Sequence, residues 1–111
     1  MVNAYIYLTV AIITEVIATS ALKATEEFTK PIPSIVVVIG YVTSFYFLTL
    51  TLRDLPIGIT YAVWSGVGIL LITLMGKYFY QQTPDLPAII GMLFIVTGVI
   101  IIHLFSKSTG H

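Results

Sequence analysis

The sequence contains no cysteine and few charged residues. The lack of cysteine excludes disulfide bridges and thiolate metal sites. Five basic and five acidic side chains leave a formal net charge of zero, so the charge gives no reason to expect a nucleic-acid partner. The two histidines, His103 and His111, lie at or near the C-terminus and do not form a metal-ligand cluster. The sequence therefore predicts no metal site and no cofactor.

Charged residues make up only 9% of the 111 residues, and 58% of the residues are apolar. A soluble domain is usually about 45–50% apolar and about 25% charged. A fold this small could not bury so much apolar surface, so the sequence predicts that membrane lipid surrounds most of the chain. The first apolar run does not fit a cleaved signal peptide, because no basic residue precedes Lys23 and three further runs follow.

Four long apolar runs divide the chain. Each has about 20 residues, which as a helix span about 30 Å and match one hydrocarbon thickness. Strands fit poorly, because stretches such as IVVVIGYV and GVIIIHLF show no period-two alternation. We therefore expect an all-α membrane protein in which residues 1–111 form a single four-helix transmembrane domain. The spans are expected at residues 4–22, 33–52, 57–76 and 86–105.

The loop charges are nearly balanced across the expected membrane. Four spans place both termini and the second loop on one side, which carries Arg53 and Lys107, while the opposite side carries Lys23, Lys30 and Lys77. Because basic loop residues set orientation, this balance is what an antiparallel dimer of one chain requires. With so few charges, the same balance can also arise by chance.

Glu15 is the only acidic residue inside any of the four runs. It lies about seven residues, or about 10 Å of helix, from the Lys23 end of its run. An ionisable group at that depth costs several kcal/mol and is a functional candidate by default. The alternative is a structural glutamate that is protonated or bonded to a neighbouring helix, but no lysine or arginine lies in any span to pair with it.

Residues three, four and seven positions from Glu15 share its helical face. They are Leu8, Ala11, Ile12, Ala18, Thr19 and Leu22. The small side chains at positions 11, 18 and 19 leave room beside the carboxylate. That room predicts either a cavity or close packing of a second helix.

The third run carries aromatic and small residues on one face, where Tyr61, Trp64, Ser65 and Gly68 follow helical spacing. Trp64 is the only tryptophan and lies well inside the run, although tryptophan favours the membrane interface. Its ring can attract a cation, and spacing alone equally allows a packed aromatic core. Gly66 and Gly68 predict a conformational hinge, with close helix contact as the alternative.

The second and fourth runs differ in what they present. One face of the second run carries Tyr41, Ser44, Phe45 and Leu48. The fourth run has no interior carboxylate or aromatic cluster, but Gly91 and Gly98 lie two turns apart on one face, which lets helices approach closely. We interpret the first three runs as the walls of a chamber and the fourth as the seam where protomers assemble.

Taken together, EVIATSALK, YAVWSGVG and LPAIIGMLFIVTG closely resemble the small multidrug resistance family, nearest to its exporters of quaternary cations. The resemblance covers essentially the whole chain. It implies a multi-pass protein of the bacterial inner membrane that works as an antiparallel homodimer, exchanges protons for lipophilic cations and is not an enzyme. Its essential glutamate corresponds to Glu15, which would bind protons and substrate in turn.

The resemblance also assigns further site residues. The family's substrate-lining tyrosines and tryptophan correspond to Tyr41, Tyr61 and Trp64, and its fourth-helix glycines at the dimer interface correspond to Gly91 and Gly98. Other substrate-lining positions correspond to Leu8, Ala11, Ile12, Thr19, Ser44 and Phe45.

One departure from the family concerns Ala18, where the family often has glycine, and we expect the extra methyl group to narrow the chamber. The guanidinium-exporting branch typically has tryptophan at this position, so its absence favours the multidrug branch. The alternatives are a guanidinium or polyamine exporter of the same family, a proton-conducting membrane subunit, a structural membrane protein without transport, and an obligate partner of a homologous chain.

Overall fold

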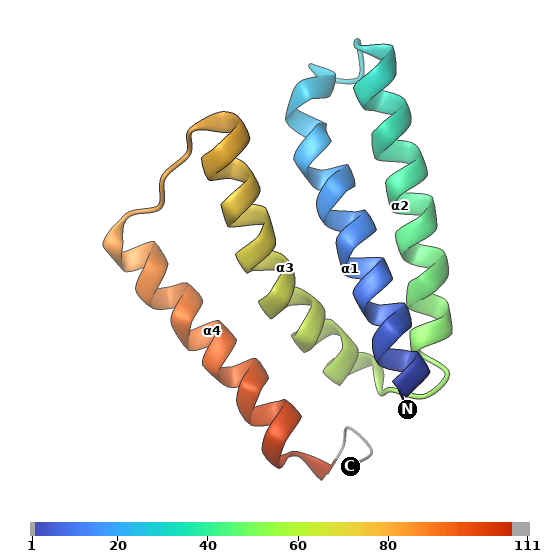
Figure 1. Cartoon of the computed structure of the whole chain (residues 1–111), viewed down its shortest axis with the longest axis vertical. Coiled ribbons are helices and arrows are strands. Elements are labelled where there is room, and N and C mark those ends of the chain that lie inside the picture. Colours follow the sequence, from blue (N-terminus) through green and yellow to red (C-terminus); the bar gives the residue numbers. More distant parts are fainter. Residues whose placement is uncertain (1, 108–111) are drawn as a thin grey trace.

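The computed structural model describes residues 2–107 as four long helices joined by short loops (Figure 1). The helices are α1 (Val2–Leu22), α2 (Pro31–Thr51), α3 (Ile57–Tyr80) and α4 (Leu86–Phe105), and a short 3-10 turn, η1 (Lys23–Thr25), follows α1. No strand occurs within residues 2–107, and all four helices are long and apolar enough to cross a membrane. The predicted all-α membrane class is therefore confirmed. His111 lies outside the described residues.

Local sequence signals set the helix ends. Pro31 begins α2, where its missing N–H is harmless. The side chain of Asp85 caps α4 by accepting a hydrogen bond of 3.0 Å from the backbone N–H of Ala88. Helix α3 extends beyond the expected end at residue 76. It stops where Gln81 adopts a left-handed φ of 53° and donates its backbone N–H to the carbonyl of Gly76.

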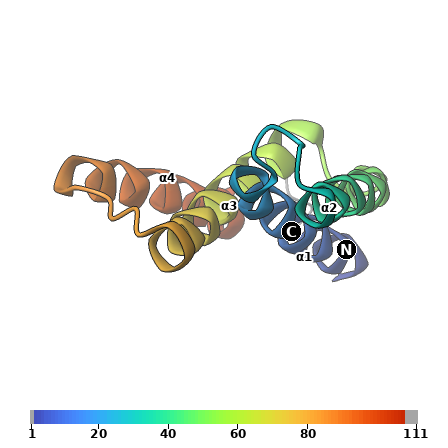
Figure 2. The same cartoon turned by 90° about the horizontal axis from the view of Figure 1, so that it is seen from above.

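The four helices lie side by side in a shallow layer. Figure 1 shows the order α4, α3, α1, α2, and the view from above in Figure 2 shows the same succession. The described chain measures 45 × 35 × 17 Å, so one dimension is much smaller than the others. In this arrangement α1 is flanked on both sides, whereas α4 lies at the outer edge beside α3.

Small side chains let α1 and α2 pack closely. Ala11, Ala18 and Ser44 are all 0% exposed, and the Ser44 hydroxyl donates to the carbonyl of Ala11 at 2.7 Å. A Cβ atom at Gly40 would lie 2.8 Å from the Cβ of Ala18, which is closer than two carbon atoms can approach. Glycine at position 40 therefore fixes the distance between the two helices.

Apolar packing joins α1 to α3. Buried residues at four-residue spacing on α1 form a cluster with Leu55, and several residues of α3 pack against it. The cluster consists of Ala4, Leu8, Ile12, Val16 and Leu55, and its neighbours on α3 include Val63, Trp64, Leu71, Ile72 and Met75. This packing places Trp64 against the middle of α1, next to the turn that carries Glu15.

The contact between α3 and α4 is narrower. A Cβ at Gly66 would lie 2.3 Å from Cγ2 of Val99, so the close approach of these helices depends on glycine. One turn further along α4, the ring of His103 meets that of Tyr5 on α1 edge to face at 5.7 Å. No residue of α4 is buried. Its apolar surface is therefore available to lipid or to another protein chain.

Candidate functional site

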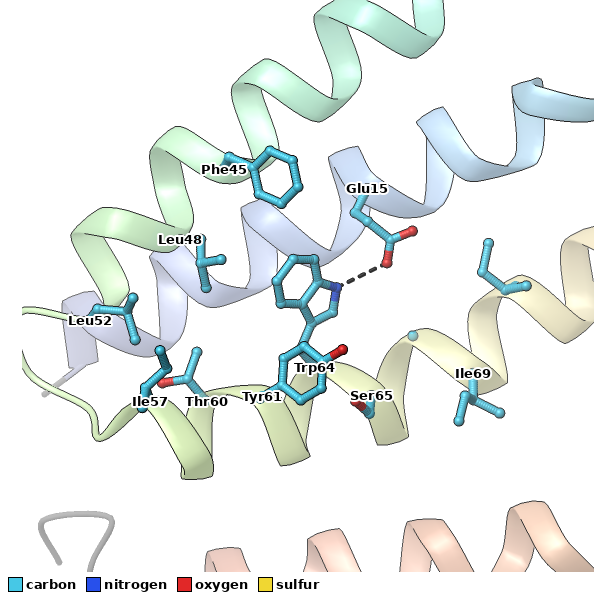
Figure 3. Close-up of a pocket in the computed structure, with 12 residues that line it drawn as sticks. Glu15, Phe45, Leu48, Leu52, Ile57, Thr60, Tyr61, Trp64, Ser65 and Ile69 are labelled. Atoms are coloured by element: carbon cyan, nitrogen blue, oxygen red, sulfur yellow. Dashed lines mark hydrogen bonds between the residues drawn. The ribbon is translucent and has the colours of Figure 1, made fainter. Parts of the chain in front are cut away.

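Glu15 accepts hydrogen bonds at both of its carboxylate oxygens, and Figure 3 shows the one from Trp64. The indole Nε1–H of Trp64 donates to Oε1 at 2.9 Å, and the hydroxyl of Thr19, one turn further along α1, donates to Oε2. Both partners are partly buried, as is Glu15 itself. The carboxylate is thus held between α1 and α3 in a fixed orientation.

A third helix reaches the carboxylate through Thr19. The phenol oxygen of Tyr41 on α2 lies 2.6 Å from the Thr19 hydroxyl oxygen. The ring of Tyr41 is stacked on that of Phe45, with centroids 6.1 Å apart and an interplanar angle of 17°. Side chains from α1, α2 and α3 therefore form one connected polar network around Glu15.

A cavity of about 570 Å³ opens beside Glu15, between α2 and α3 (Figure 3). This volume is in the range typical of small-molecule sites, about 300–1,000 Å³. Its walls are mostly aliphatic and aromatic. The lining residues are Glu15 from α1, Phe45, Leu48 and Leu52, and, from α3, Ile57, Thr60, Tyr61, Trp64, Ser65, Gly68, Ile69 and Ile72.

The electrostatics of this cavity depend on one group. Within residues 2–107, Glu15 is the only acidic or basic residue that lines the cavity, and no lysine, arginine or histidine in this range forms an ion pair with it. The single ion pair found in this range joins Lys30 to Glu26 in a loop, at 3.5 Å. A carboxylate among apolar walls, without a cationic partner of its own, is suited to bind a cation that also carries apolar surface.

Aromatic rings border the carboxylate on the cavity side. Tyr61 and Phe45 each meet the Trp64 ring edge to face, with centroids 6.1 Å and 6.3 Å away. Tyr61 is 66% exposed and Phe45 is 53% exposed, so the cavity is open on that side. Ring faces attract cations. The aromatic group therefore adds a second attraction for a positively charged ligand.

The structure distributes the predicted substrate-lining residues over three locations. Phe45, Tyr61 and Trp64 line the cavity together with Glu15. Thr19 and Tyr41 lie in the polar network, outside the lining. The remaining four lie in helix contacts: Leu8 and Ile12 in the buried cluster, and Ala11 and Ser44 between α1 and α2.

Ala18 does not narrow the cavity, and that expectation was wrong. Its Cβ faces Gly40 on α2, and Ala18 is not among the lining residues. The physical reason is that the face of α1 around Glu15 is wide enough to contact two helices. Ala18 lies on the part that faces α2, whereas the Glu15 carboxylate turns towards α3.

The predicted glycines also occupy different surroundings. Gly66 lies against Val99 at the contact with α4, and Gly68 lines the cavity. A Cβ at Gly68 would lie 3.7 Å from Oε1 of Glu15, so this glycine leaves space beside the carboxylate. Among the described residues, a Cβ at Gly91 or Gly98 would meet no atom within 4 Å beyond its own helix backbone and chain neighbours, so both glycines face open space.

Sequence reasoning did not propose several cavity residues as site residues. They are Leu48, Leu52, Ile57, Thr60, Ser65, Ile69 and Ile72. Steps of four from Trp64 in both directions lead to Thr60, Gly68 and Ile72, and steps of three and seven from Phe45 lead to Leu48 and Leu52. That spacing was the available signal. It does not distinguish an aliphatic side chain that lines a cavity from one that faces lipid.

Comparison with known proteins places the chain among relatives of similar length. A family model described as Small Multidrug Resistance protein matches residues 3–95. The chain is 53% identical over 109 residues to the multidrug transporter EmrE of Escherichia coli (strain K12), which covers 98% of this chain and 99% of EmrE.

Two further relatives are quaternary ammonium compound-resistance proteins. QacE of Escherichia coli is 49% identical over 107 residues, covering 96% of this chain and 97% of QacE. QacG of Staphylococcus sp. (strain ST94) is 40% identical over 104 residues, covering 94% of this chain and 97% of QacG. The similarity therefore extends over all four helices.

Proposed function

Because the chain belongs to the small multidrug resistance family, we propose that it is a proton-coupled antiporter that exports lipophilic cations across the bacterial inner membrane. One observation carries the proposal: among residues 2–107, Glu15 is the only acidic or basic residue that lines an otherwise largely apolar cavity. Such a carboxylate can hold either a proton or a cation, but not both at once. The protein is accordingly a transporter and not an enzyme.

Competition at Glu15 explains the coupling. A cation that enters the cavity loses its hydration. Only the ionised carboxylate offers a charge that compensates the cation for this loss, whereas the neutral acid does not. A proton that binds to Glu15 therefore displaces the cation, and the cation displaces the proton. If the site opens alternately to the two sides of the membrane, this exclusion produces exchange of one for the other.

The walls of the cavity indicate the substrate class. Aliphatic side chains and the rings of Phe45, Tyr61 and Trp64 offer dispersion and cation–π attraction but few directional polar contacts. Such a lining accepts many shapes, provided that the cation is lipophilic. The names of relatives such as QacE refer to quaternary ammonium compounds. We assign quaternary ammonium and polyaromatic cations as substrates.

The working unit is a homodimer with the two protomers antiparallel. The cavity lacks a wall on the side where Ile57 and Tyr61 are 73% and 66% exposed, and a second copy would supply it. The outward-facing Gly91 and Gly98 on α4 suit close contact with the same helix of that copy. The near-equal loop charges are compatible with insertion in both orientations. Two Glu15 side chains would then face one chamber.

Purified protein in liposomes tests the proposal. With the interior acidic and the exterior neutral, we expect uptake of tetraphenylphosphonium that collapses when the proton gradient is dissipated. Glu15→Gln should reduce uptake to that of protein-free liposomes. Uptake by wild type at that background level would contradict the proposal.

Two additional measurements on the same liposomes separate the alternatives. Guanidinium uptake without tetraphenylphosphonium uptake would indicate an exporter of the guanidinium type. Proton flux that proceeds equally without any cation would indicate a proton-conducting subunit. We expect neither result, because the cavity has a largely apolar, partly aromatic lining around its carboxylate.

A further inference from the structure

The two oxygens of the Glu15 carboxylate have partners of different chemistry. Oε1 accepts from the Trp64 indole at 2.9 Å, and Oε2 contacts the Thr19 hydroxyl. An indole N–H can only donate, whereas a hydroxyl group can donate one proton and also accept. The two sides of the carboxylate therefore differ in what they permit when a proton arrives.

Counting protons fixes the direction of the hydrogen bonds around ionised Glu15. The carboxylate has no proton to give, so Thr19 must donate its single proton to Oε2. Thr19 then has only lone pairs to offer to Tyr41, whose oxygen lies 2.6 Å away. Tyr41 therefore donates to Thr19, and the chain of hydrogen bonds runs from Tyr41 through Thr19 to Glu15.

Protonation of Glu15 reverses this direction. Since Oε1 already accepts from a group that cannot accept in return, the acid proton is better placed on Oε2, where it can be donated to Thr19. Thr19 then turns its own proton towards Tyr41, which accepts it. Each hydroxyl group keeps its proton and only rotates, and the proton that arrived from water stays on Glu15.

We propose that Thr19 and Tyr41 are positioning residues for the exchange, which place the exchangeable proton on Oε2 and stabilise the ionised carboxylate. This inference rests on the proposed antiport. Thr19 and Tyr41 are absent from the cavity lining, so a bound cation need not displace them. A hydrogen bond donated to a charged carboxylate is about twice as strong as one between neutral groups. The chain of hydroxyl groups therefore favours the form of Glu15 that binds cations.

Other titratable groups on the adjacent helices do not replace this chain. Tyr61 lines the same cavity, but the hydrogen bonds that Glu15 accepts within residues 2–107 come from Thr19 and Trp64 and not from Tyr61. The remaining titratable side chains on α2 and α3 are Tyr46, Lys77, Tyr78 and Tyr80, and on α4 His103 packs against Tyr5. None of them forms an ion pair with Glu15 within the described part of the chain.

The first test measures tetraphenylphosphonium binding to the purified full-length protein across a range of pH. Wild type should lose affinity as pH falls, with a definable midpoint. Thr19→Val removes the hydroxyl group at similar volume and should move that midpoint to higher pH by about one unit, because the ionised form loses the stronger bond. Thr19→Ser should restore the profile of wild type.

Thr14→Val is the matched control. Thr14 precedes Glu15 on α1 and is also partly buried, but its hydroxyl donates to the carbonyls of Val10 and Ala11 and not to the carboxylate. Like Thr19→Val, the variant Thr14→Val loses one threonine hydroxyl group from α1. The midpoint of this variant should therefore stay with that of wild type.

The second test follows Tyr41 directly by NMR of protein labelled with ¹³C at tyrosine Cζ, with the resonance assigned through Tyr41→Phe. In wild type this resonance should shift as pH passes through the binding midpoint, since Tyr41 changes from donor to acceptor. In Thr19→Val the shift should disappear, because the connection to Glu15 is broken. In Thr14→Val it should persist.

The possible results distinguish the proposed role of Thr19 and Tyr41 from the antiport on which it rests. Cation binding by wild type that does not depend on pH would overturn both. Wild-type binding that depends on pH, with an unchanged midpoint in Thr19→Val, would overturn the role of Thr19 alone and leave the antiport intact. A Tyr41 resonance that responds to pH equally in wild type and in Thr19→Val would show that Tyr41 does not respond to Glu15 through Thr19.

Discussion

The indole nitrogen of Trp64 lies 2.9 Å from Oε1 of Glu15, and this hydrogen bond joins the first half of α3 to α1. It explains why a tryptophan lies far from the membrane interface that its side chain usually prefers. The same ring forms part of the cavity wall. Trp64 therefore orients the carboxylate and contacts whatever the cavity binds.

Two substitutions at position 64 separate these roles. Trp64→Phe keeps a ring but removes the N–H donor, whereas Trp64→Ala removes both. For aromatic cations such as ethidium, Trp64→Ala should lower affinity by about 30-fold, since stacking and cation–π attraction are each worth about 1 kcal/mol. For tetraethylammonium the loss should be smaller. Calorimetric titration of both ligands measures this, and equal losses for the two would argue against stacking on Trp64.

Glu15→Asp keeps the charge but shortens the side chain by one methylene group. The shorter carboxylate should no longer reach both Trp64 and Thr19, whose contacts define its orientation. We expect this variant to retain binding that depends on pH, with its midpoint displaced and its affinity for tetraphenylphosphonium reduced. A binding curve identical to that of wild type would mean that the two hydrogen bonds do not matter for the site.

Gly40→Ala should destabilise the protomer by about 1–3 kcal/mol, because the new methyl group would overpack the contact between α1 and α2. The new methyl group would collide with the Cβ of Ala18, which is attached directly to the backbone and cannot rotate away. Gly98→Ala is the matched control, since within residues 2–107 its added Cβ would meet no atom within 4 Å beyond its own helix backbone and chain neighbours. Unfolding in mixed micelles of increasing SDS content measures both, and equal stability of the two variants would contradict the packing described.

The same control variant addresses assembly. If α4 is the seam between protomers, Gly98→Ala should leave the protomer fold intact and weaken self-association. Dilution into lipid vesicles, with association followed by energy transfer between labelled copies, measures this equilibrium. Association as tight as in wild type would place the dimer contact elsewhere.

Tyr80→Phe should loosen the end of the molecule at which α1 and α3 both terminate. The Tyr80 hydroxyl donates to the carbonyl of Ser20, one of the last four carbonyls of α1, and Lys23 Nζ lies 5.0 Å from the centre of the Tyr80 ring. The variant loses the hydrogen bond and keeps the ring, so we expect a loss of about 1 kcal/mol in stability. Faster amide exchange in residues 18–22 would accompany it, and unchanged exchange there would contradict the capping role.

The sequence predicted the fold because the membrane allows few solutions. Four apolar runs of bilayer length had to be helices. The starts expected at residues 57 and 86 match those of α3 and α4, whereas α2 begins at Pro31, two residues before its expected start. The end of α3 was predicted at residue 76, four residues before the helix ends at Tyr80. The polar pair Gln81 and Gln82 lies beyond it, but KYFY between Lys77 and Tyr80 gives no sign of whether the helix continues into the interface.

Within the site, chemistry was predicted better than geometry. Glu15 was recognisable because a lone acidic residue in a span has few explanations, and Trp64 and Tyr61 were recognisable by type and spacing. The bond between Thr19 and Tyr41 could not be predicted from residues 22 positions apart, because it depends on how α1 and α2 pack. For the same reason, residues that share a helical face with Glu15, such as Leu8 and Ile12, proved to lie in the buried cluster.

Proton release on cation binding tests the central claim most directly. Protein in detergent, in weakly buffered solution above the midpoint of the pH profile, is mixed with saturating tetraphenylphosphonium while a pH indicator is followed, and the titration is repeated at successively lower pH. The account predicts that release is small where Glu15 is already ionised, grows as pH falls towards the midpoint, and is absent from Glu15→Gln at every pH. Cation binding that releases no protons at any pH, or equal release by Glu15→Gln, would contradict it.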